Sequence, residues 1–96
     1  MGNIAFDWNP RKARSNFAQH GVSFEEAQTV FLDDNARLID DPDHSEEEER
    51  FVLLGYSCQG RCLVVHHCYR KSDAVIRLIS ARRATALEEE EYWSFQ

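Results

Sequence analysis

The stretch FVLLGYSCQGRCLVVHHCYRKSDAVIRLISA, residues 51–81, decides the fold. It contains three runs rich in β-branched and aromatic residues, at 51–57, 61–69 and 74–81, and this composition is typical of β-strands. Cys58-Gln59-Gly60 supplies the first turn, with Gly60 expected at a positive φ, and Arg70–Asp73 supplies the second. Because these connections are too short for a crossover, the three runs predict an antiparallel meander.

Two helices are predicted before this stretch. Asn9-Pro10 opens the first, with Asn9 as the cap, and Gly21 stops it in the left-handed conformation after about residue 19 or 20. Ser23-Phe24-Glu25-Glu26 is a capping box that opens the second. Apolar residues then recur at helical spacing, which gives this helix a buried stripe: Phe24, Ala27, Val30 and Phe31.

A third helix is predicted after the strands. Thr85-Ala86-Leu87-Glu88 is another capping box, and the helix should continue through Trp93. Between the second helix and the meander, Ala36–Asp40 has the pattern of a short strand, and Asp41–Glu49 forms a loop or a turn of helix around Pro42. Helices and strands are therefore segregated along the chain, which predicts an α+β fold in a single domain over residues 1–96.

The charge is unevenly distributed. The chain of 96 residues has a net charge of −6, but 11 of its 17 acids lie in two runs, at 40–49 and 88–91. The rest of the chain carries an excess of Lys and Arg. In one interpretation both acidic runs are solvated faces. In the other, a basic surface serves an anionic partner and the acidic runs lie elsewhere in space.

The cysteines and the apolar runs indicate where in the cell the protein is located. Three cysteines without a visible secretory signal favour reduced thiols over a disulfide framework. No apolar run approaches the roughly 20 residues that a membrane span needs. The sequence therefore predicts a cytoplasmic protein with no membrane partner.

A metal site is not predicted. His66 and His67 are adjacent in a strand, so their side chains point to opposite faces and cannot easily share one ion. Cys62, His66 and Cys68 share a parity, but no CxxC pair or second cluster supports them. We expect Cys62 and Cys68 to be buried as small hydrophobic side chains.

Arg77 interrupts an apolar strand. Unbroken alternation would place Arg77 on one face with Val75 and Ala81, and Arg82 on the other face. If the second turn centres near Ser72, His67 lies opposite Arg77, although a register shift of one residue would break this pairing. The arginine must find an anion or reach solvent. Two partners stay open: an acid of this chain, such as Glu49, or a phosphate.

Lys12, Asn16 and His20 are spaced to lie on one face of the first helix. This polar stripe faces a phosphate backbone or an active cleft in one interpretation. In the other, Asn16 is solvated and His20 interacts with the helix C-terminus. His20 is a plausible general acid or base, because imidazole titrates near neutral pH.

Several segments, covering most of the chain, resemble the BrnT toxins of type II toxin–antitoxin systems. They are FDWNPRKARSNFAQHGVSFEEAQTVFLDD at 6–34, HSEEEERF at 44–51, GYSCQGRCLVV at 55–65 and IRLISARRAT at 76–85. The resemblance implies a compact RelE-like α+β fold and a ribonuclease that cuts RNA and arrests growth. It also implies neutralisation by a ribbon-helix-helix antitoxin. The antitoxin would bind the operator DNA, so the toxin would associate with DNA only through the antitoxin.

The matching polar positions overlap those selected by spacing. Arg70, Arg77 and Arg82 would bind the phosphate, and His20 or Glu49 would be the acid or base. Four further residues would contact RNA: Lys12, Asn16, Arg61 and His67. His44 and Arg50 also match.

The implied mechanism is RNA cleavage without a metal or another cofactor, in which the 2′-hydroxyl attacks the neighbouring phosphate. One departure stands out: Glu88–Glu91 precede Tyr92, where the family commonly has a basic Glu-Arg element. This difference would weaken or relocate RNA binding. Two alternatives stay open, a non-catalytic subunit that organises a DNA-binding partner and a small metal-binding module.

Overall fold

The strands predicted at 51–81 form the centre of one five-stranded sheet. The computed structural model describes residues 4–40, 50–70 and 74–94. β3 (Phe51–Tyr56), β4 (Cys62–Arg70) and β5 (Val75–Arg83) pair antiparallel in chain order, as predicted. β2 (Arg37–Asp40), also predicted, pairs with β3, and β1 (Ala5–Asp7) pairs with β5, which gives the order β1-β5-β4-β3-β2.

The sheet is mixed, so the prediction of a purely antiparallel meander is wrong. β1 runs parallel to β5, with Asp7 beside Arg77. The sequence did not reveal β1 because three residues are too few to establish an alternating pattern. Two predicted segments, the loop at 41–49 and most of the turn at 70–73, lie outside the described residues.

The helices begin and end where their capping residues predict. Asn9 caps α1 (Pro10–His20), and Gly21 ends it at φ 69°. Ser23 caps α2 (Phe24–Gln28) by accepting the backbone N–H of Glu26 at 3.0 Å. A 3₁₀ turn, η1 (Thr29–Leu32), then completes the predicted second helix. The Glu26 side chain does not return to Ser23, because it is bound to Arg61 and Ser57 instead.

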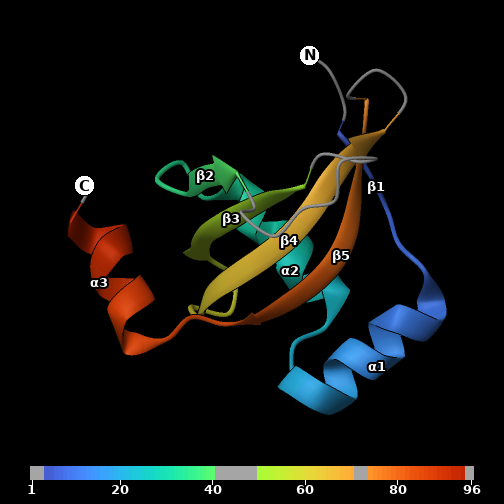
Figure 1. The fold of residues 1–96 in the computed structure, drawn as a ribbon, viewed down its shortest axis with the longest axis horizontal. Coiled ribbons are helices and arrows are strands. Elements are labelled where there is room, and N and C mark those ends of the chain that lie inside the picture. Colours follow the sequence, from blue (N-terminus) through green and yellow to red (C-terminus); the bar gives the residue numbers. More distant parts are fainter. Residues whose placement is uncertain (1–3, 41–49, 71–73, 95–96) are drawn as a thin grey trace.

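The main hydrophobic core lies on one face of the sheet, under α1, α2 and η1. Phe24, Ala27 and Val30 are fully buried there against strand residues that include Leu63 and Val65. In Figure 1, α2 lies behind β4 and β5, and α3 (Ala86–Ser94) lies to one side, beyond the end of β5. A smaller cluster on the second face packs Tyr92 of α3 against strand residues that include Val52 and Val64.

A β-bulge interrupts the pairing of β4 with β5. Ser80 lies opposite His66, but Leu78 lies opposite His67, so Ile79 is an extra residue on β5. An extra residue reverses the alternation of side chains beyond it.

The bulge changes which residues share a face. Arg77 lies opposite Cys68, so the predicted pairing of Arg77 with His67 is wrong. Arg82 lies opposite Val64, which is four positions before Cys68 on β4 and therefore on the same face. Arg77 and Arg82 therefore share one face of the sheet, whereas unbroken alternation predicted that they lie on opposite faces.

Asn16 joins α1 to the outer edge of β5. Its amide nitrogen donates to the carbonyl oxygens of Val22 and Ala81, both at 2.9 Å, and its amide oxygen accepts the Ala81 N–H at 3.0 Å. β1 covers this edge only at 75–77, so the Asn16 amide continues the pairing where the short strand has ended. Asn16 is 6% exposed, so the predicted solvated role is wrong, and its amide is used in these backbone hydrogen bonds.

α3 is attached to the sheet by specific polar contacts as well as by Tyr92 packing. The predicted capping box forms completely: the Glu88 N–H donates to Thr85 at 3.2 Å and the Thr85 N–H donates to Glu88 at 2.9 Å. The Tyr92 hydroxyl donates to Asp33 at 2.8 Å, which ties α3 to the segment after η1. The helix therefore keeps a fixed position at one end of the second face.

The three cysteines differ in environment, and this difference predicts their reactivity. Cys62 and Cys68 are buried, as expected, and burial raises the pKa of the Cys62 thiol to about 11. Cys58 is exposed in the β3–β4 turn. We expect iodoacetamide at neutral pH to modify Cys58 in the folded protein and all three cysteines in urea, as read by mass spectrometry. Rapid modification of Cys62 in the folded protein would contradict this burial.

Candidate functional site

The three predicted phosphate ligands, Arg70, Arg77 and Arg82, lie on the second face of the sheet. Arg77 lies opposite Cys68 and Arg82 opposite Val64, and Arg70 is two positions beyond Cys68 on β4. Alternation therefore places all three guanidinium groups on the same side as His66. We call this surface the arginine face and define it by its strand residues: Val64, His66, Cys68, Arg70, Val75, Arg77, Ser80 and Arg82.

Arg77 forms an ion pair with Asp7, its neighbour on β1. The described partner acid is thus Asp7, whereas Glu49, the acid suggested from the sequence, lies outside the described residues. The Arg77 side chain is 30% exposed and the Asp7 side chain 50% exposed. Exposed pairs of this kind contribute about 0–1 kcal/mol, so a phosphate could replace the carboxylate at little cost.

Arg82 is held more firmly. Both terminal nitrogens of its guanidinium group donate to the Glu88 carboxylate at 2.8 Å, the bidentate geometry in which arginine binds carboxylates best. The side chains of the pair are 36% and 30% exposed. Arg82 therefore links the arginine face to α3, and Glu88 occupies the side of the guanidinium group that a phosphate would use.

The Arg82–Glu88 pair predicts an unusually acidic carboxyl. Hydrogen bonds from Arg82 lower the pKa of Glu88 from 4.5 to about 2. Since the pKa is lower in the folded chain, the pair stabilises the fold above pH 4.5 and loses its effect as the pH falls toward 2. We expect carbon-detected NMR to show Glu88 titrating near pH 2, and closer to its ordinary range in Arg82→Ala. Titration near 4.5 in the unchanged protein would contradict the pair.

Arg61 lies apart from the arginine face. Its Nε donates to the buried Glu26 carboxylate at 2.9 Å, and its guanidinium group also donates to the Gly21 carbonyl at 3.1 Å. Glu26 accepts a further bond, at 2.7 Å, from Ser57. These contacts join α2 to the β3–β4 turn, so we leave Arg61 out of the proposed RNA site.

His67 lies in the main core. It is fully buried, and its ring packs edge-on against Phe31 at 4.9 Å and Tyr69 at 5.3 Å between ring centroids. Burial lowers the pKa of its imidazole and favours the neutral form. A fully buried side chain offers no surface to RNA, so we also leave His67 out of the site.

The polar stripe on α1 does line a cleft. Lys12, Asn16 and His20 meet Ile79 and Ser80 of β5 around a space of about 170 Å³. Ser15 and Gln19 complete the lining, which contains no carboxylate among the described residues. Lys12 and His20 are therefore close to Ser80 on the edge of the arginine face. The Asn16 amide, by contrast, is hydrogen-bonded to the backbone of Val22 and Ala81 and attaches α1 to β5.

Arg50 is a candidate that the expected site did not include. It lies two positions before Val52, so alternation directs it toward the arginine face. Its Nε is buried and lacks a hydrogen-bond partner among the residues that the structure describes. A buried donor of this kind calls for an acceptor, which a bound anion or water would supply. The HSEEEERF match already contained this residue, but the sequence alone did not show that its Nε would be buried.

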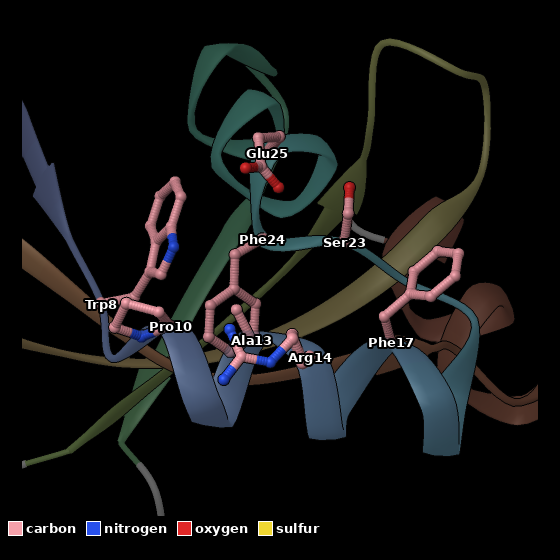
Figure 2. A pocket seen from close by; sticks show the side chains of 8 residues that line it. All are labelled: Trp8, Pro10, Ala13, Arg14, Phe17, Ser23, Phe24 and Glu25. Carbon is pink, nitrogen blue, oxygen red and sulfur yellow. The ribbon is translucent and has the colours of Figure 1, made fainter.

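A second hollow lies between α1 and α2, with a volume of about 410 Å³. Figure 2 shows Trp8 and Phe17 toward opposite ends of α1, with Phe24 behind them and Arg14 and Glu25 on its rims. Its lining is mainly apolar, and its two charges are of opposite sign. This hollow is therefore a poorer match for a phosphate than the arginine face.

Two further observations concern the part of the chain that the structure describes. No group of three or more His, Cys, Asp or Glu side chains is arranged there to hold a metal ion. No helix in the same residues is both long enough and apolar enough to cross a membrane.

Comparison with known proteins identifies the family. The family model "Ribonuclease toxin, BrnT, of type II toxin-antitoxin system" matches residues 8–88. This chain belongs to the BrnT family. As a member of the BrnT family it is a ribonuclease toxin of a toxin–antitoxin system, with an antitoxin as its partner. The matched region includes β4 and β5, the strands that carry Arg70, Arg77 and Arg82, and it ends at Glu88.

A structural comparison supports the BrnT fold. The 1.1 Å crystal structure of the Brucella abortus ribonuclease toxin BrnT superposes with a TM-score of 0.66 and 20% sequence identity. The match covers 86% of this chain and 99% of the Brucella chain. No curated protein sequence matches the chain. Likeness to RelE-type toxins stays a prediction.

Proposed function

We propose that this BrnT-family ribonuclease binds and cuts RNA at the arginine face, without a metal ion. The observation that carries the proposal is the bulge at Ile79, since it aligns Arg82 with Arg77 and Arg70 on one surface. Three guanidinium groups on one sheet face supply planar donors for phosphate oxygens. Arg50, the residue before β3, would add a fourth guanidinium group.

The chemistry that suits this arrangement is attack by the RNA 2′-hydroxyl on the adjacent phosphorus. The bond from O2′ to phosphorus forms while the bond from phosphorus to O5′ breaks. Negative charge builds on the phosphate oxygens, and fixed cations stabilise that charge most effectively. Asp7 would leave Arg77 as the phosphate arrives, because their exposed pair contributes little free energy.

The α1 cleft would hold a neighbouring phosphate of the same strand. Lys12 and His20 line it together with Ser80, which also belongs to the arginine face. The described part of its lining carries Lys12 and His20 and no carboxylate, which favours an anion. His20, from this cleft, and Glu49, outside the described residues, stay candidates for the acid or base.

The proposed activity is tested with the purified chain, free of antitoxin, on single-stranded RNA and DNA of one sequence. We expect RNA to be cut in the presence of EDTA and DNA to stay intact, because DNA lacks the 2′-hydroxyl. The RNA fragments should end in 2′,3′-cyclic phosphate and 5′-hydroxyl groups. No cleavage of any RNA, with or without ribosomes, would overturn the proposal and favour a non-catalytic subunit of a repressor complex.

We also propose that the antitoxin is of the ribbon-helix-helix type, reads the operator DNA, and docks on α3. This helix exposes Glu90 and Glu91 beside two large apolar side chains, Leu87 at 69% and Trp93 at 57% exposure. Acidic and apolar groups together fit a basic, amphipathic segment of a partner. Calorimetry with the product of the neighbouring gene should show binding that Glu90→Lys weakens. No binding at micromolar concentration would count strongly against this pairing.

A further inference from the structure

His66 occupies the middle of the arginine face. It lies opposite Ser80 on β5 and opposite Val52 on β3, so its side chain shares the face with Arg77 and Arg82. Arg82 is its diagonal neighbour on β5, at about 7–8 Å between backbone positions in a regular ladder. Arg77 lies opposite Cys68, on the other side of the bulge. His66 is half-buried, so a bound phosphate could reach it.

We infer that His66 accepts the proton of the attacking 2′-hydroxyl, an inference that rests on the proposed cleavage at the arginine face. The other two histidines of the described residues are placed elsewhere: His67 is in the core, and His20 is on α1. A phosphate held by Arg77, on the strand beside β4, would lie next to the imidazole, which brings the adjacent 2′-hydroxyl toward a ring nitrogen. Imidazole is the side chain best suited to exchange a proton near neutral pH.

Other groups near this face suit the role less well. Glu88 has its pKa lowered to about 2, so its carboxylate is a weak base. Asp7 lies on the edge strand β1, which β5 separates from β4, and so it is farther from the centre of the face than His66. Cys68 is 1% exposed and burial raises the pKa of the Cys62 thiol to about 11, so neither thiol supplies an accessible base.

The proposed step balances in atoms and charge. The proton of O2′ passes to His66 as the O2′–phosphorus bond forms and the phosphorus–O5′ bond breaks. The imidazolium then gives a proton to the departing O5′, directly or through water. His66 ends neutral, and the RNA ends as a 2′,3′-cyclic phosphate and a 5′-hydroxyl.

The pH dependence of this step reflects the charged groups around His66. Those on the same face come from every neighbouring element: Arg70 and Cys68 on β4, Arg77 and Arg82 on β5, Asp7 on β1, Arg50 before β3, Arg37 on β2, and Glu88 on α3. Arginines predominate among them and keep their charge at all relevant pH values. An acid limb in the rate profile therefore reports a group other than these arginines.

The test compares His66→Gln with the unchanged protein and with Gln59→Ala, a control in the exposed β3–β4 turn. We expect His66→Gln to lower the rate of RNA cleavage about 10²-fold or more, to remove the acid limb of the pH–rate profile, and to leave RNA binding within about twofold. In His66→Ala, added imidazole should restore part of the rate. A purely structural His66 would not show this rescue.

The outcomes separate the inference from the proposed function. If the unchanged protein cuts RNA and a folded His66→Gln cuts it at the same rate, the role of His66 is overturned while the arginine face stands. If His20→Gln removes the acid limb and His66→Gln keeps it, the proton acceptor is His20 and the inference is also overturned. If the unchanged protein cuts no RNA, the proposed function itself fails.

Discussion

Arg77→Ala is expected to lower RNA cleavage about 10²–10³-fold, the range seen when one donor to a developing oxyanion is removed. The same substitution should change the free energy of unfolding by less than about 1 kcal/mol, because the pair of Arg77 with Asp7 is exposed. Activity and stability thus separate in one variant. The two measurements are initial cleavage rates in EDTA and urea unfolding.

Arg83→Ala is the matched control for this substitution. Arg83 belongs to the same strand and is exposed, but it lies opposite Leu63, a residue of the main core, and so on the other face of the sheet. It should retain cleavage within about twofold. Asp7→Asn should retain or raise the rate, since the carboxylate competes with phosphate for Arg77. Full activity in a folded Arg77→Ala variant would remove Arg77 from the site.

Glu26→Ala should produce the largest loss of stability among these variants, about 1–3 kcal/mol, because it leaves polar groups in a mostly buried position without their acceptor. The Glu26 side chain is 2% exposed and neutralises Arg61, whose guanidinium group would keep its charge in a half-buried position. Removing it also leaves the Ser57 hydroxyl without its acceptor. A domain of this size has a total stability of about 5–15 kcal/mol, so the midpoint temperature of thermal unfolding should fall sharply.

Two companion variants keep this prediction testable if Glu26→Ala fails to fold. Glu26→Gln can still accept a bond from Ser57 and should lose less stability. Glu25→Ala, an exposed neighbour on the same helix, should change stability by about 0.5 kcal/mol or less. Hydrogen bonds from Arg61 lower the pKa of Glu26, so the stabilisation should be full above pH 4.5 and decline in more acidic solution. Equal unfolding curves for Glu25→Ala and Glu26→Ala would contradict the structural role.

Local signals predicted most of the fold. Asn9, Gly21 and Thr85 mark helix ends because capping depends on side chains adjacent in sequence, and each is found at such an end. Gly60 has a φ of 75° in the first turn, as its position there predicted. The exception is β1, which exists because β5 offers an edge to pair with and not because its own three residues have a strand pattern.

The candidate site was harder to predict because it depends on one long-range irregularity. A bulge such as the one at Ile79 is defined by the partner strand, so alternation along β5 alone placed Arg77 and Arg82 on different faces. Ion pairs were equally hidden: the partners of Arg61 and Arg77 are 35 and 70 residues away in the chain. Residue type and spacing identified the arginines, but only the register shows which of them act together.

Polar residues on a helix or strand also proved ambiguous. Asn16 has the spacing of an RNA-contacting residue and instead completes the backbone bonding of β5. His67 has the same residue type as His66 but points into the aromatic core. The two histidines are adjacent in sequence, so only the direction of each side chain distinguishes the core residue from the face residue.

The most direct measurement is a map of RNA binding by amide NMR, with a 2′-O-methyl oligoribonucleotide that cannot be cleaved. The central claim is that RNA lies on the arginine face. It predicts chemical-shift changes at His66, Arg70, Arg77 and Arg82, with smaller ones around Lys12 and His20. Changes confined to the hollow between α1 and α2, around Trp8 and Phe17, would contradict it.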